Sequence, residues 1–300
     1  MSRSVLFDSK EACIFLSTLL VHASVRIGYM STSRRKVMSM SRRALLSVLL
    51  LSLATTNALR APPIATFHAT THPRLTIDAI TMKAAQPITS RSLTGLATFG
   101  ATAGPLVDAV HNQVLLQYDV FPITIALFNA KTSLLIPPLL ALTYALLGSV
   151  LPSLTERFLV GDGRLLTPPT ASFQPRARAA LAVVSTIGII KLSEILTLAP
   201  LSANLSVGVL LACCLVQWLV IDAAWASLSL ACVVAIGGPL AEIPFLGLGC
   251  WHYVAPDYFP LGAGANAWAG LNYVTAPCYF AVTTDAIAIG RWLSSSENTE

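Results

Sequence analysis

Charged residues are scarce in this 300-residue chain. Asp, Glu, Lys and Arg together make up 11% of it, whereas hydrophobic residues make up 55%. The mean hydropathy of +0.70 is far above that of an ordinary soluble domain. This composition is typical of a polytopic membrane protein.

Several sequence signatures of chemistry are also missing. The six cysteines include no Cys-x-x-Cys pair, and most of them lie in or beside apolar runs, so they indicate small buried side chains rather than disulfides or a zinc site. No His-Glu-x-x-His, Gly-x-Ser-x-Gly, P-loop or Rossmann pattern occurs, which removes support for zinc hydrolysis, a serine nucleophile and nucleotide chemistry. We therefore expect no metal and no cofactor.

The net charge of +5 does not indicate a nucleic-acid partner. Residues 1–92 hold 12 of the 19 Lys and Arg but only three of the 14 Asp and Glu, so the rest of the chain is acidic. The positive charge belongs to the N-terminal leader, so it does not indicate a surface that binds nucleic acid.

Residues 1–92 have the features of a targeting presequence. At 38–58 a short basic segment precedes an apolar core and small residues, as in a secretory signal peptide that begins at Met38 or Met40. Residues 59–92 are basic, nearly free of acids and rich in Thr, Ser, Ala and Pro, as in a plastid transit peptide. This order favours a plastid membrane reached through the secretory route, with the endoplasmic reticulum membrane as the alternative.

From residue 93 onward, six apolar runs are long enough to cross about 30 Å of hydrocarbon as helices. Gly-Pro and Pro-Pro pairs within them predict kinks, because proline removes a backbone donor, and kinks favour an interior pocket. We predict an all-α, six-helix transmembrane bundle over residues 93–293, followed by a polar tail at 294–300. The predicted spans are 93–117, 121–151, 177–198, 203–224, 226–249 and 265–293.

Arginines gather in the polar loop at 152–176, between the second and third predicted spans. Positive residues prefer the cytosolic side, or the stromal side in a plastid. We expect this loop, the segment around Asp222 and the C-terminus after Arg291 to lie on that side.

Ionisable residues inside the spans mark candidate sites, because a charge at the bilayer centre costs at least about 2.5–3.5 kcal/mol by insertion scales. Asp108 and His111 are one helical turn apart, which allows an internal pair or a proton-transfer site. Lys191 and Glu194 have the same spacing, and we expect a structural ion pair. Glu242 has no obvious partner in its own span.

Five short elements run in order across residues 121–293. They are Ile136-Pro137-Pro138; Lys191-Leu192-Ser193-Glu194; Trp218 with Asp222; Tyr253-Val254-Ala255-Pro256-Asp257-Tyr258; and Pro277-Cys278-Tyr279-Phe280 followed by Ile289-Gly290-Arg291. In this order they resemble the Insig family, six-helix membrane proteins that bind oxysterols and retain the sterol sensor Scap in the endoplasmic reticulum. The resemblance implies that Trp218 lines a lipid pocket and that Asp222 binds a polytopic membrane protein partner. The family's paired tryptophans before the double proline are Leu134 and Leu135 here.

We therefore expect a non-enzymatic, Insig-like membrane protein that binds a sterol, diacylglycerol or isoprenoid lipid in a bundle cavity. It would regulate lipid or sterol metabolism through a membrane partner, and an oligomer is compatible with this role. Trp218 and Tyr253 are the predicted apolar contacts, and Asp108, His111 and Glu242 the polar ones. Two alternatives stay open: an enzyme that modifies a lipid or isoprenoid with Asp108, His111 or Glu242 as acid and base, and a scaffold that holds a partner helix without a ligand.

Overall fold

The structure is a computed structural model that describes residues 88–110, 114–125, 130–158, 163–199, 201–260 and 270–295. The predicted signal peptide, almost all of the transit-like segment, and His111 lie outside the described residues. All described residues belong to one compact unit of the chain, residues 70–300.

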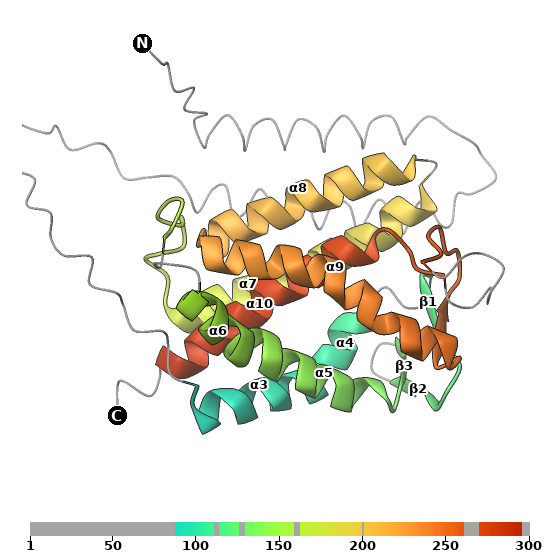
Figure 1. The fold of residues 1–300 in the computed structure, drawn as a ribbon, viewed down its shortest axis with the longest axis horizontal. Coiled ribbons are helices and arrows are strands. Elements are labelled where there is room, and N and C mark those ends of the chain that lie inside the picture. Colours follow the sequence, from blue (N-terminus) through green and yellow to red (C-terminus); the bar gives the residue numbers. More distant parts are fainter. Residues whose placement is uncertain are drawn as a thin grey trace, which may run out of the picture. The chain divides into compact units, whose positions relative to one another are not determined.

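Helices dominate this unit, and short strands lie at one end of it (Figure 1). In chain order the elements are α3 (Ser90–Thr102), α4 (Gly104–Asp108), β1 (Leu116–Tyr118), β2 (Pro122–Ile125), β3 (Ala130–Ser133), α5 (Ile136–Ala145), the π-helical turn η2 (Leu146–Val150), α6 (Leu151–Phe158), α7 (Pro175–Leu198), α8 (Ala203–Ile221), α9 (Trp225–Gly247), β4 (Trp251–Tyr253) and α10 (Thr275–Ser295).

Four helical stretches within the described residues are long and apolar enough to cross a membrane. They are Ile136–Glu156, Pro175–Leu198, Ala203–Ile221 and Trp225–Gly247. The chain is therefore mostly helical, with the composition of an integral membrane protein. α3 and α10 correspond to the first and sixth predicted spans and are not among the four, so the count of six stays a prediction.

Residues 109–135 depart from the predicted helices. α4 ends at Asp108, and β1, β2 and β3 occupy residues that the sequence analysis assigned to the first two spans. β1 pairs antiparallel with β4, with Gln117 opposite His252, and β2 pairs antiparallel with β3. The predicted bounds were wrong here because apolar content alone does not separate a helix from a strand. The Ile, Thr and Val residues of this segment favour strands.

The centre of the bundle is α10, which contacts α3, η2, α7, α8 and α9. Most of its residues between Thr275 and Gly290 are buried, so its polar side chains face protein rather than lipid. The outward faces of α8 and α9 are apolar instead, with Leu215, Val233 and Ile236 exposed. Such exposed apolar side chains suit contact with lipid.

Glycine permits a close contact between α10 and η2. A Cβ on Gly290 of α10 would lie 1.9 Å from the carbonyl oxygen of Gly148 in η2. Small residues of this kind let membrane helices approach backbone to backbone.

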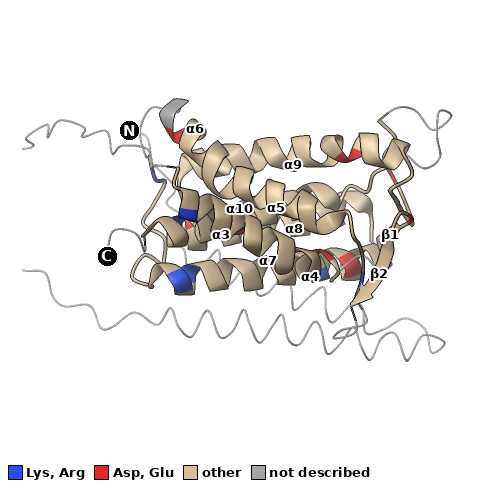
Figure 2. Ribbon diagram, turned by 90° about the horizontal axis from the view of Figure 1, so that it is seen from below, with Lys and Arg blue, Asp and Glu red and all other residues tan. Residues whose placement is uncertain are grey.

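Most of the charged residues lie towards the two ends of the helices (Figure 2). Arg178 interacts electrostatically with Arg164, Asp222 and Arg291 at one end, which we call the arginine end. The strands lie at the opposite end with Asp119, Glu242 and Asp257, and we call this the acidic end. The three segments that were expected on one side of the membrane from the distribution of arginines lie together at the arginine end.

Candidate functional site

The Glu242 carboxylate, near the end of α9, is the centre of a polar cluster at the acidic end. The Tyr253 hydroxyl donates to its Oε2 at 2.8 Å, and the Tyr279 hydroxyl donates to its Oε1 at 2.8 Å. The Trp251 indole N–H donates to Oε2 at 3.4 Å. The Thr275 hydroxyl donates to the Tyr253 hydroxyl at 3.0 Å. Three elements, α9, β4 and α10, therefore converge on one carboxylate, which we call the Glu242 cluster.

A helix C-cap turns β4 back towards Glu242. Gly249 adopts a left-handed φ of +69° directly after α9. Its N–H bonds the Leu246 carbonyl at 3.0 Å, and the Cys250 N–H bonds the Phe245 carbonyl at 2.9 Å. This pair of bonds is the Schellman motif, which glycine favours because it has no Cβ. The chain then enters β4, whose alternate residues share one face of the strand.

Gly238 lets Tyr279 approach α9. A Cβ on Gly238 would lie 2.4 Å from Cδ1 of the Tyr279 ring. Glu242 follows four residues later on the same face of the helix. Because Gly238 has no side chain, the Tyr279 ring packs against the helix at this position. The Tyr279 hydroxyl therefore reaches the Glu242 carboxylate one turn further on.

Asp108 adjoins this cluster from α4. The Tyr118 hydroxyl donates a hydrogen bond to Asp108 Oδ2. The Tyr118 ring meets Trp251 edge-on, with 6.3 Å between centroids, and Trp251 stacks on Phe245 at 5.0 Å. Burial, and then the nearby Asp108 carboxylate, raise the pKa of Tyr118 well above its ordinary value. The phenol therefore stays protonated and remains a donor.

The same holds for Tyr253. Burial, followed by the charge of Glu242, raises its pKa well above the ordinary value for a tyrosine. Its ring belongs to an apolar cluster with Leu246 and Trp251. Its hydroxyl bonds Glu242 as well, a polar role that the sequence analysis did not assign to it.

Trp218 lies away from the Glu242 cluster, near the end of α8 on the arginine side. Its indole N–H donates to the Ala224 carbonyl at 3.0 Å and to the Ser227 hydroxyl at 3.1 Å. Of the five predicted ligand contacts, the structure brings together Asp108, Glu242 and Tyr253 but not Trp218. His111 is outside the described residues.

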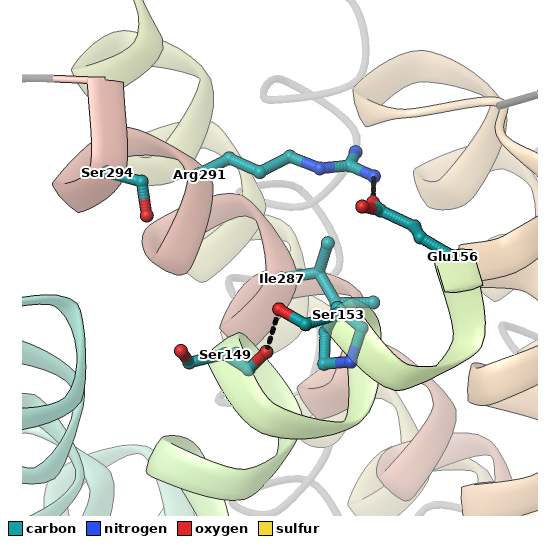
Figure 3. Close-up of a pocket in the computed structure, with 8 residues that line it drawn as sticks. Ser149, Ser153, Glu156, Ile287, Arg291 and Ser294 are labelled. Carbon is teal, nitrogen blue, oxygen red and sulfur yellow. Dashed lines mark hydrogen bonds and ion pairs between the residues drawn. The ribbon is translucent and has the colours of Figure 1, made fainter. Parts of the chain in front are cut away.

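Asp222, the predicted partner contact, is buried in an ion-pair network at the arginine end. Arg291 of α10 donates through Nη1 to Asp222 Oδ1, and its Nη2 lies 3.5 Å from Glu156 Oε1. Figure 3 shows Arg291 extended towards Glu156. Asp222 is 3% exposed, so a partner could reach its carboxylate only if the surrounding side chains moved.

The described residues enclose a small cavity beside this network, lined by Gly148, Ser149, Pro152, Ser153, Glu156, Ile287, Arg291 and Ser294. Its volume of about 10 Å³ is that of roughly one water molecule. A sterol does not fit there, so this cavity is not the predicted lipid pocket.

The predicted ion pair lies on α7. Lys191 Nζ is 2.6 Å from Glu194 Oε2, and both side chains are partly exposed. The two charges neutralise each other within one helical turn.

Sequence reasoning missed the donors to Glu242 and one further carboxylate. Tyr279 was noted only as part of a family element, and Trp251 was not singled out. Asp285 lies within an apolar run like Glu242, so the same rule for ionisable residues in membrane spans could have found it.

No family model, curated protein or solved structure matches this chain. The relation to the Insig family therefore rests on the five short sequence elements and stays a prediction.

Proposed function

We propose that this integral membrane protein binds a membrane lipid with a free hydroxyl group, a sterol, diacylglycerol or isoprenoid alcohol, at Glu242. The observation that carries the proposal is the set of donors around the carboxylate. A carboxylate offers about four acceptor positions. Tyr253 and Trp251 use both positions at Oε2, and Tyr279 uses one at Oε1. The remaining position at Oε1 can accept a hydrogen bond from a lipid hydroxyl.

The position of Glu242 on α9 supports entry from the bilayer. Glu242 is partly exposed on this helix, although its carboxylate is turned towards α10. A lipid can therefore approach from the side, without crossing the interior of the bundle. Glu242 also lies near the end of its span, and the hydroxyl groups of lipids lie near the ends of spans rather than at the bilayer centre.

Aromatic side chains supply the apolar contacts that such a site needs. The stacked rings of Trp251 and Phe245 lie beside the carboxylate. Lipid sites combine mostly apolar walls with a few orienting polar groups. The polar group here is the carboxylate, held by its three donors.

Two finer parts of the proposal come from the sequence. The resemblance to the Insig family supports a regulatory role through a membrane protein partner. The two-part presequence supports a plastid membrane, with the endoplasmic reticulum as the alternative.

Photoreactive, clickable sterol and diacylglycerol probes test the proposal on the full-length protein in liposomes. We expect light-dependent labelling that unlabelled lipid displaces, and about tenfold weaker labelling of Glu242→Gln, because a hydrogen bond to a charged group contributes about 1.5–3 kcal/mol. Glu194→Gln is the matched control and should label like wild type, since Glu194 pairs with Lys191 instead. Absent labelling of the wild type, or equal labelling of both variants, would contradict the proposal.

An enzymatic role is the alternative, and one observation favours it. Asp108 and Glu242 both act electrostatically on Tyr118, so two carboxyl groups share one aromatic cluster. Such a pair could serve as general acid and base on a bound lipid. Chemical conversion of a lipid probe by the wild type, lost in Asp108→Asn, would establish this role in place of simple binding.

A further inference from the structure

A second polar cluster lies inside the bundle and takes no part in the proposed lipid site. Asp285 on α10 is 0% exposed, and neither of its carboxyl oxygens makes a hydrogen bond of regular geometry. The hydroxyl groups of Tyr144 on α5 and Thr186 on α7 lie near this carboxyl group. Three helices therefore direct oxygen atoms towards the same buried position.

Gln217 brings α8 into the same cluster. Its amide nitrogen donates to the Thr186 hydroxyl at 2.8 Å, to the Ser185 hydroxyl at 3.0 Å and to the Ala182 carbonyl at 3.2 Å. The Thr186 hydroxyl in turn donates to the Ala281 carbonyl at 3.1 Å. The Gln217 amide oxygen is buried and receives no hydrogen bond.

The hydrogen bonding of this cluster is incomplete. Three buried acceptor atoms, both Asp285 oxygens and the Gln217 amide oxygen, receive no hydrogen bond of regular geometry, although the Tyr144 and Thr186 hydroxyls and the Ala286 N–H lie close to the carboxyl group. The Gln217 amide nitrogen and the Thr186 hydroxyl already donate to other groups. Native interiors rarely leave buried acceptors unpaired. None of the ion pairs among the described residues includes Asp285, so no basic side chain compensates its charge.

We propose that Asp285, Tyr144, Thr186 and Gln217 bind one Na⁺ ion inside the bundle. All four supply oxygen, the ligand atom that hard cations prefer. A bound proton would satisfy one of the three unpaired acceptors, whereas a cation contacts several oxygens at once.

A monovalent ion fits the charge of the site. Asp285 supplies a single negative charge, and the other three ligands are neutral. Divalent cations are usually held by several carboxylates. Among the described residues, no group of three or more His, Cys, Asp or Glu side chains could hold a metal ion. The Na⁺ ion would connect α5, α7 and α8 to the central helix α10.

Thermal unfolding of the purified full-length protein tests the site. The Tm is measured in NaCl and in N-methyl-D-glucamine chloride at constant ionic strength and at several pH values. We expect NaCl to raise the Tm of the wild type by several degrees in a saturable way, because a ligand that binds the folded state stabilises it. Asp285→Asn should remove this Na⁺ dependence, and Thr186→Ala should shift it to higher Na⁺ concentration. The control Asp257→Asn, in the loop after β4, should keep it.

Binding of radioactive ²²Na⁺ to the wild-type protein provides a readout that needs no variant to fold. Saturable binding with about one ion per chain, displaced by unlabelled Na⁺ but not by N-methyl-D-glucamine, supports the proposal. A wild-type Tm that depends on pH but not on Na⁺ would overturn it, since Asp285 would then bind only a proton. Na⁺ dependence that persists unchanged in Asp285→Asn would overturn it as well.

Discussion

Tyr279 on the central helix α10 donates a 2.8 Å hydrogen bond to Glu242 on the lipid-facing helix α9. This bond crosses between two segments that are almost forty residues apart in the chain. It also sets the direction of the carboxylate, whose remaining acceptor position at Oε1 is the one that we assign to a lipid hydroxyl. The lipid site therefore depends on how closely α9 and α10 pack.

The first prediction concerns this packing. Gly238→Ala would place a methyl group 2.4 Å from the Tyr279 ring. We expect overpacking to lower the free energy of unfolding by about 1–3 kcal/mol and to weaken lipid labelling, because the displaced ring moves its hydroxyl away from Glu242.

The neighbouring residue is a matched control. Gly237 has no atom within 4 Å of its would-be Cβ, so Gly237→Ala is free of steric conflict. In a helix interior this change should stabilise the protein by roughly 0.5–1 kcal/mol. The Tm of both variants is measured by thermal unfolding. Equal changes of Tm in the same direction would contradict the packing account.

The second prediction concerns the contact between α10 and η2. A Cβ on Gly290 would collide with the carbonyl oxygen of Gly148, which is backbone and cannot rotate away. We expect Gly290→Ala to separate the two elements and to lower the yield of folded, monodisperse protein in detergent. Gly188→Ala on α7, where no atom lies within 4 Å, should leave the yield unchanged. A normal size-exclusion profile for Gly290→Ala would contradict this prediction.

The third prediction concerns the ion pair at the arginine end. Arg291→Gln leaves the buried Asp222 carboxylate without its charged partner. Breaking a buried ion pair costs about 3–5 kcal/mol, because an uncompensated charge stays buried. The double variant Asp222→Asn/Arg291→Gln should recover part of this loss. The free energies of unfolding are measured by chemical denaturation. If the effects of the two substitutions on this free energy were strictly additive, the two side chains would not be coupled.

The sequence predicted α7, α8 and α9 to within a few residues. Their apolar runs are long, and polar or proline-containing segments separate them. The region between α4 and α5 was predicted wrongly, because the apolar residues that pair there as short strands also fit a membrane helix. High hydropathy indicates that a segment has apolar surroundings, but it does not show whether the segment is a helix or a strand.

The Glu242 cluster was predictable only in part. The carboxylate itself was found, since an acid inside an apolar span requires compensation. Its donors Tyr253 and Tyr279 come from segments that are distant in sequence, and no spacing rule brings them together. The burial of Asp222 against Arg291 depends equally on tertiary structure.

The fourth prediction concerns location. Residues 38–91 fused to a fluorescent reporter should direct it through the secretory route to a plastid membrane. The apolar core is recognised first and removed, which exposes the basic, hydroxyl-rich segment as a second signal. Reporter confined to the endoplasmic reticulum would exclude the plastid assignment and strengthen the role of a sterol regulator.

The most direct measurement for the lipid site is the position at which a photoreactive lipid attaches. A probe with its reactive group close to the hydroxyl should label the end of α9 and the segment from Trp251 to Tyr253 in wild-type protein, as read by mass spectrometry of the peptides. In Glu242→Gln these adducts should fall about tenfold relative to any on the exposed face of α8, as expected from the loss of a charge-assisted hydrogen bond. Adducts spread evenly over α8 and α9, and unchanged in Glu242→Gln, would show that lipid contacts the outer surface without a site.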